Sequence, residues 1–137
     1  MKGGCLCGAV RYEVTGPALF GGYCYCADCR KTSSSHSASI AIAEATMTCT
    51  GATREFSKTG GSGNPVTRVF CPACGVGIYS KGARAGVVML KAGTLDDEFL
   101  EAFKPMASIY VRRCPSWDQP RAGLPTFPEM PTQPPSS

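Results

Sequence analysis

The sequence contains a single histidine, His36, among its 137 residues. Histidine-rich metal sites are therefore excluded. A Ser-His-Asp triad would have to use this one residue, and no G-x-S-x-G motif accompanies it. If the protein binds a transition metal, thiolates must supply most of the ligands. His36 follows a run of three serines, and in this polar surrounding we expect a solvated side chain.

Long apolar runs are also missing, and only 9% of the residues are aromatic. No run approaches the roughly 20 residues of a membrane-spanning helix, and the first residues contain no apolar core of a secretory signal. We therefore expect no membrane partner and a cytoplasmic location. In that reducing compartment cysteines serve more often as metal ligands or nucleophiles than in disulfides.

Glycine and proline are plentiful, with 16 and 11 residues respectively. Such a composition favours short strands joined by turns over long helices, so we predict a mostly β chain. The segment from Thr94 to Phe103 is the best candidate for a helix, because Thr94 can cap it and Pro105 must follow its end. We expect a flexible loop over residues 60–65 and a disordered, Pro-rich tail over 128–137. The predicted strands span residues 9–14, 39–42, 67–70, 87–90 and 108–111.

Cysteine is the residue that the sequence has in excess, with nine copies. Seven of them fall into three tight clusters, and the odd total argues against a closed disulfide framework. Structural zinc takes four tetrahedral ligands, whereas catalytic zinc takes three and keeps an open position. The clusters divide accordingly into a closed set and an open set. The closed set is Cys5, Cys7, Cys71 and Cys74, and the open set is Cys24, Cys26 and Cys29.

Two alternatives remain for the open set. Cys49, Cys114 or His36 would close it if one of them supplied a fourth ligand. The three local ligands could also fail to retain zinc in the isolated protein, because three hold the metal less tightly than four. We expect Cys49 and Cys114 to behave as small, partly buried apolar residues.

The motifs resemble a known family. The stretches 4–12, 24–31 and 70–75 (GCLCGAVRY, CYCADCRK and FCPACG) and the segment 108–127 are similar to the glutathione-dependent formaldehyde-activating enzyme family, whose domain centromere protein V shares. The resemblance covers roughly residues 2–127 and implies one domain over 1–127. It implies a β-tent fold of antiparallel sheets with two zinc ions per chain. Cys5, Cys7, Cys71 and Cys74 would hold the structural zinc, and Cys24, Cys26 and Cys29 the catalytic one.

The resemblance also implies a reaction. The family joins glutathione and formaldehyde into S-hydroxymethylglutathione, which is formally a carbon–sulfur lyase running in reverse. The partner would then be a small thiol such as glutathione. We expect Arg30 and Lys31 to meet its carboxylates and Ser33 to donate a hydroxyl. The family usually has histidine where this chain has Tyr25, so Tyr25 is expected on the substrate side of the second site.

Two other functions fit the same pattern. The site could act on a different thiol, or the chain could be a non-enzymatic zinc module that binds protein or nucleic acid. The net charge of +4 and the pair Arg112-Arg113 point towards nucleic acid. However, the chain has no long basic stripe with interleaved aromatic residues. Seven thiolates and two zinc ions would also reduce the charge to about +1, which makes nucleic acid an unfavourable partner.

Overall fold

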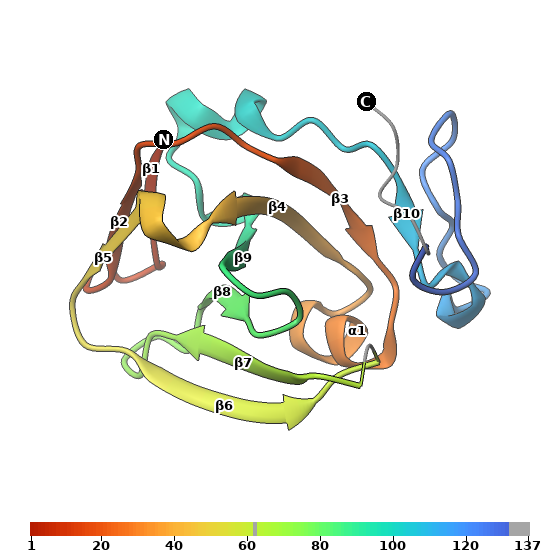
Figure 1. The fold of residues 1–137 in the computed structure, drawn as a ribbon, viewed down its shortest axis with the longest axis horizontal. Helices are drawn as coiled ribbons and strands as arrows, with labels where there is room; N and C mark the ends of the chain where they lie inside the picture. The colour runs from red at the N-terminus through yellow and green to blue at the C-terminus, as the bar shows by residue number, and fades with distance from the viewer. Residues whose placement is uncertain (62, 132–137) are drawn as a thin grey trace.

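The computed structural model describes residues 1–61 and 63–131. In these residues ten strands, one α-helix and four short 3₁₀ helices form, which confirms the mostly β prediction (Figure 1). The strands are β1 (Lys2–Gly4), β2 (Arg11–Val14), β3 (Phe20–Cys24), β4 (Ser37–Ala43), β5 (Met47–Thr50), β6 (Arg54–Thr59), β7 (Pro65–Phe70), β8 (Gly77–Lys81), β9 (Val87–Lys91) and β10 (Ser108–Ile109). The helices are α1 (Ala27–Ser33), η1 (Glu44–Thr46), η2 (Ala92–Thr94), η3 (Asp97–Ala102) and η4 (Val111–Arg113).

The strands form two sheets. The smaller has the order β1-β2-β5 and the larger the order β10-β3-β4-β9-β8-β7-β6. All strand pairs are antiparallel except β10 with β3, which is parallel. In Figure 1 the small sheet lies at the left, β3 and β4 run above β6 and β7, and α1 lies between them on the right.

The core is built from the alternating apolar faces of these strands. Val10, Tyr12 and Val14 are all buried, as their alternation predicts. They pack in one cluster with apolar side chains of β4 and β9, such as Ile42 and Leu90. Cys5 and Cys71 belong to the same cluster, so the first cysteine set is attached directly to the core.

Most predicted strands are confirmed, within one or two residues at their ends. The segments 9–14, 39–42, 67–70 and 87–90 correspond to β2, β4, β7 and β9. The strand predicted over 108–111 ends early, at Ile109. Tyr110 has a left-handed backbone with φ of 55°, and the chain then turns into η4. A strand cannot continue through that conformation.

The helix predicted over 94–103 is confirmed only in part, because the 3₁₀ helix η3 forms there but begins at Asp97, and Thr94 is the last residue of η2. Thr94 caps neither: its hydroxyl lies 2.8 Å from the Tyr12 hydroxyl and donates to the Lys91 carbonyl at 2.7 Å. Leu95 then takes an extended backbone and is buried in the core. Tertiary packing of Leu95 and the bond to Tyr12 therefore break the local helical pattern.

The chain end and the glycine-rich loop are only partly described. The expected loop over 60–65 joins β6 to β7, with the Gly60 amide donating to the Asn64 carbonyl at 2.9 Å. Residue 62 lies outside the described residues, as do residues 132–137 of the predicted disordered tail. Glu129, near the start of that tail, forms an ion pair with Arg112 at 2.7 Å. Within the described ranges, no helix is long and apolar enough to span a bilayer.

Candidate metal centres

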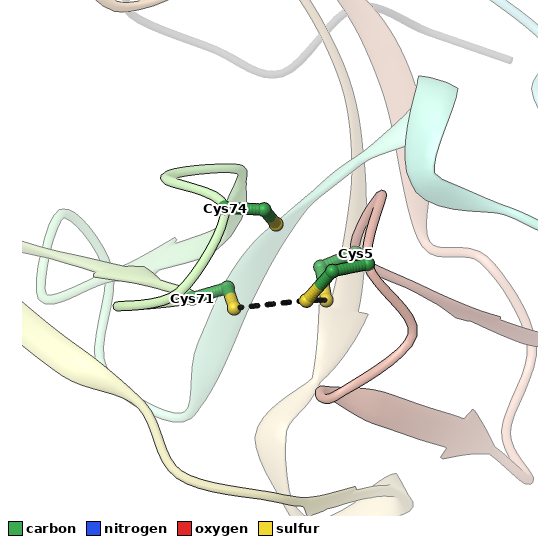
Figure 2. Close-up of side chains that lie close together, drawn as sticks. Cys5, Cys71 and Cys74 are labelled. Carbon is green, nitrogen blue, oxygen red and sulfur yellow. Dashed lines mark hydrogen bonds between the residues drawn. The ribbon is translucent and has the colours of Figure 1, made fainter.

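The four cysteines of the first set converge on one point. Cys5 and Cys7 lie in the turn between β1 and β2, and Cys71 and Cys74 in the turn between β7 and β8. Their four sulfur atoms all lie within 4.8 Å of one another. The Sγ of Cys7 is 3.6 Å from that of Cys5 and 3.7 Å from that of Cys71. Figure 2 shows the sulfurs of Cys5, Cys71 and Cys74 pointing towards one another from the two turns.

These distances fit a tetrahedral zinc ion. Zn–S bonds of about 2.3 Å place the sulfurs of a tetrahedron about 3.8 Å apart. Four thiolates complete the coordination, as in structural zinc sites. The first set therefore has the donor atoms and the spacing of a closed metal centre.

The two turns that carry these cysteines have the same backbone hydrogen bond and the same glycine conformation. The Cys5 amide donates to the Val10 carbonyl at 3.0 Å, and the Cys71 amide donates to the Val76 carbonyl at 3.0 Å. In each turn a glycine, Gly8 or Gly75, adopts a left-handed backbone with φ near 80°. This glycine lets the chain reverse tightly enough for both cysteines of a turn to face the same point.

Backbone amides also stabilise negative charge on the sulfurs. The Val10 N–H donates to Cys5 Sγ at 3.3 Å and is the main reason why the pKa of that thiol falls to about 6. The N–H groups of Cys7 and Val76 lower the pKa of Cys74. For Cys7 the Ala9 amide acts in the same direction, but the neighbouring thiols and burial together raise its pKa to about 11. Cys5 and Cys74 therefore lose their protons more easily than free thiols, and a bound cation would displace the proton that remains on Cys7.

The three cysteines of the second set surround the start of α1. Cys24 ends β3, Cys26 is the N-cap of α1, and Cys29 lies in its first turn. The Cys29 amide donates to Cys26 Sγ at 3.3 Å, so a cysteine takes the place of the usual oxygen cap. The three sulfurs lie within 4.8 Å of one another. Helix α1 was not predicted from the sequence, because cysteine is not among the common capping residues.

In the part of the chain that the structure describes, no fourth cysteine, histidine or carboxylate joins this set. Cys49, Cys114 and His36, which could have closed it, lie elsewhere. Cys49 and Cys114 are half-buried and burial raises the pKa of both thiols, as expected for partly buried apolar residues. A metal ion held here would have three protein ligands among the described residues.

Charge within the second set concentrates on one sulfur. Hydrogen bonds from Cys24 and Cys26 lower the pKa of Cys29, while the same contacts raise the pKa of Cys24. Ser37 and the cation of Lys91 further favour the Cys29 thiolate. A bound divalent cation would release the protons that remain on the other two sulfurs.

An open groove of about 680 Å³ adjoins the second set. Its walls come from the N-terminal end of α1, the β6–β7 turn, and the segments around η4 and Glu129. The groove is lined by Cys26, Ala27, Asp28, Lys58, Thr59, Gly60, Gly61, Tyr110, Arg112, Arg113, Glu129 and Met130. It therefore brings three cations and two carboxylates next to a candidate metal ligand.

Tyr110 is the aromatic residue of this groove. A Cβ added at Gly61 would lie 2.9 Å from the Tyr110 hydroxyl, so the glycine makes room for it. Burial raises the pKa of Tyr110, and the charges of Cys24 and Cys26 add to that effect, which indicates that the ring lies near the second set. From the sequence, Tyr110 was predicted only as a strand residue, and Lys58 was not predicted as a site residue. No local sequence pattern indicates the left-handed backbone of Tyr110 or a groove formed by segments that are distant in the chain.

The residues predicted to bind substrate lie outside the lining of this groove. Tyr25 is buried, with 2% of its surface exposed, and its hydroxyl donates to the Gln119 carbonyl at 3.2 Å. Arg30 and Ser33 are half-buried on α1, and Lys31 is exposed. Their roles towards substrate stay predictions.

His36 was expected to be solvated, but only a third of its side chain is exposed. Its ring lies 4.9 Å from the ring of Tyr25 and 5.4 Å from that of Tyr23. Its Nδ1 is 2.9 Å from Ser35 Oγ and 3.3 Å from Asp118 Oδ2. The expectation was wrong because the C-terminal segment folds back and brings Asp118, 82 residues away, against the loop before β4.

Comparisons with known proteins agree with this geometry. Residues 1–113 match the model of the family "Glutathione-dependent formaldehyde-activating enzyme", and this range contains all seven clustered cysteines. A crystal structure of a protein from Rhodobacter sphaeroides is similar with a TM-score of 0.57 and 17% identity, covering 71% of this chain and 89% of that chain. At this identity the likeness concerns the fold alone. A comparison with curated proteins finds no match.

Proposed function

Because the chain belongs to the glutathione-dependent formaldehyde-activating enzyme family, we propose that it is a zinc-dependent enzyme of the carbon–sulfur lyase type. Its substrate would be a thiol adduct such as S-hydroxymethylglutathione, formed from glutathione and formaldehyde. The observation that carries the proposal is the second cysteine set. Three sulfurs gather within 4.8 Å of one another without a fourth protein ligand in the described residues, beside an open groove.

The residues fit the metal that the family implies. Cys5, Cys7, Cys71 and Cys74 would hold a structural zinc, and Cys24, Cys26 and Cys29 a second one. When bound at the second site, zinc supplies an open position at which a substrate thiol loses its proton near neutral pH. Strand β3 and helix α1 orient the three ligands, and the N–H of Cys29 keeps Cys26 in place.

The reaction joins the thiol to formaldehyde through a C–S bond and moves the thiol proton to oxygen. The sulfur of the thiol attacks the carbonyl carbon of formaldehyde, a C–S bond forms, and the electron pair of the C=O π bond moves to oxygen. The thiol proton ends on that oxygen and gives the hydroxymethyl product. The reverse direction breaks the C–S bond and returns thiol and aldehyde. The Tyr110 hydroxyl in the groove is suited to donate a hydrogen bond to the oxygen as its charge develops.

The zinc-loaded protein should form S-hydroxymethylglutathione faster than buffer does. The test mixes protein, glutathione and formaldehyde and follows the adduct by NMR exchange or rapid mixing against the spontaneous rate. Cys26→Ser should remove the acceleration, because Cys26 is both a proposed ligand and part of the groove wall. The matched control is Cys114→Ser, since Cys114 belongs to neither metal set.

An adduct rate equal to that of buffer for the wild type would contradict the formaldehyde reaction. Repeating the assay with other thiols then asks whether the same site serves a different substrate. We further propose that the protein works in the reducing cytosol, a location supported by its nine free cysteines.

A further inference from the structure

We propose that the groove beside Cys26 binds a carboxylate of the thiol substrate through Arg112 and Arg113, and that Glu129 competes with the substrate for Arg112. This inference rests on the proposed function, because it takes the ligand to be a thiol. Beyond that function, the thiol carries a negative charge, the two arginines bind this charge, and the C-terminal segment has a regulatory role.

The groove has an excess of positive charge on one wall. Lys58 is neutralised by Asp28, whose Oδ1 lies 2.7 Å from its Nζ. Arg112 and Arg113 both belong to η4 and are both exposed. Among the described residues, Arg113 forms no ion pair, so its guanidinium is available to an incoming anion.

Arg112 already holds a carboxylate. Its guanidinium lies 2.7 Å from Oε1 of Glu129, and both side chains are about 60% exposed. An ion pair this exposed to solvent is weak, so a ligand carboxylate can replace it. The Glu129 carboxylate thus occupies the position at Arg112 where the carboxylate of the ligand would bind. The amides of Val111 and Arg112 donate to the Phe127 and Pro128 carbonyls at 3.1 and 3.4 Å, which holds the segment before Glu129 against η4.

The left-handed backbone of Tyr110 orients this wall. The φ of 55° ends β10 and starts η4 at the next residue, so the two arginines follow a fixed change of direction. Tyr110 and Cys26 line the same groove as the arginines. At about 680 Å³ the groove has the size of typical small-ligand sites, which measure about 300–1,000 Å³. A peptide-like thiol can therefore reach the cysteine set with its sulfur and η4 with a carboxylate.

The test measures binding rather than turnover. The probes are S-methylglutathione, whose sulfur is blocked so that no adduct can form, and its diethyl ester, which lacks the two carboxylates. Isothermal titration with the zinc-loaded full chain should show weaker binding of the ester. Arg113→Gln should weaken binding of S-methylglutathione by about three- to tenfold, and Glu129→Gln should tighten it by about two- to fivefold. Neither substitution should alter the affinity for the ester.

Arg84→Gln is the matched control, because Arg84 is exposed, lies outside the groove lining and makes the same charge change. Its affinity should equal that of the wild type. Equal affinities for S-methylglutathione in wild type and Arg113→Gln would overturn the arginine site. Unchanged or weaker binding in Glu129→Gln would overturn the competition. Because the blocked thiol cannot react, these outcomes are independent of the adduct assay, and inactivity in that assay would leave the binding result intact.

Discussion

Tyr110 adopts a left-handed backbone, which is uncommon for a residue with a side chain and costs about 1–3 kcal/mol. Strain of this kind persists where the surroundings impose it, and functional sites are frequent places for it. Here the surroundings are β10 on one side and η4 on the other, and the side chain lines the groove beside Cys26. Tyr110 is therefore the residue outside the cysteine sets that we expect to matter most for turnover.

Replacing Tyr110 by phenylalanine should lower kcat for adduct formation by about ten- to a hundredfold, because a hydrogen bond to a charged oxygen contributes about 1.5–3 kcal/mol. The ring and the backbone remain, so zinc content and thermal stability should not change. Steady-state kinetics and metal analysis measure the two effects. Tyr79→Phe, a change in a half-buried tyrosine of β8 outside the groove lining, is the control. A wild-type kcat in the Tyr110 variant would exclude the proposed role of its hydroxyl.

Among the secondary-structure elements, a side-chain hydrogen bond joins β2 of the small sheet to η2, the 3₁₀ helix that directly follows β9 of the large sheet. Tyr12 of β2 is buried, and its hydroxyl lies 2.8 Å from Thr94 Oγ1 at the end of η2. Burial raises the pKa of Tyr12 to about 12, because the interior disfavours a phenolate. The Thr94 hydroxyl makes this contact instead of capping a helix, and the predicted helix begins only at Asp97, as the 3₁₀ helix η3.

The stability that Tyr12 contributes should disappear at alkaline pH. A phenol whose folded pKa is raised stabilises the fold fully below its unfolded pKa of about 10. That contribution is lost as pH rises through the folded pKa of about 12. Urea unfolding should therefore show Tyr12→Phe as less stable than wild type by about 1 kcal/mol at pH 8, with a difference that shrinks above pH 10. Stability curves that stay parallel up to pH 11.5 would contradict this account.

At the scale of the whole molecule, the two cysteine sets have different structural consequences. The first set joins turns that are 64 residues apart in sequence, and two of its members belong to the core. The second set spans six residues at the junction of β3 and α1. Metal at the first site should therefore stabilise the whole fold, whereas metal at the second should act locally.

Removing one ligand from each set separates these effects. Wild type should contain two zinc ions per chain, and Cys29→Ser should contain one and retain most of its thermal stability. Cys71→Ser should lower Tm by about 10 °C or more. If that variant does not fold, stepwise chelation of the wild type should show one zinc that leaves without unfolding and one whose loss unfolds the protein. Cys114→Ser is the control for loss of a thiol outside both sets. Equal losses of Tm in the Cys29 and Cys71 variants would contradict the division.

Features that depend on short spacing follow from the sequence alone. The three cysteine motifs and the alternation of Val10, Tyr12 and Val14 were readable, because ligands a few residues apart and side chains two apart obey local geometry. The pairing of two cysteine turns 64 residues apart followed instead from the four ligands of structural zinc and from the family resemblance. Strands such as β1, β3 and β6 were not predicted, since their glycines or exposed polar residues carry no apolar pattern.

The surroundings of the second site, by contrast, come from the packing of segments that are distant in sequence. The groove combines Cys26 with Lys58, Tyr110 and Glu129, which come from segments far apart in the chain. The returning C-terminal segment contacts the buried Tyr25 and the half-buried His36, away from where the sequence had placed them. Such neighbours depend on sheet order and on a left-handed turn at Tyr110. These are the outcome of packing the whole chain, and no local pattern encodes them.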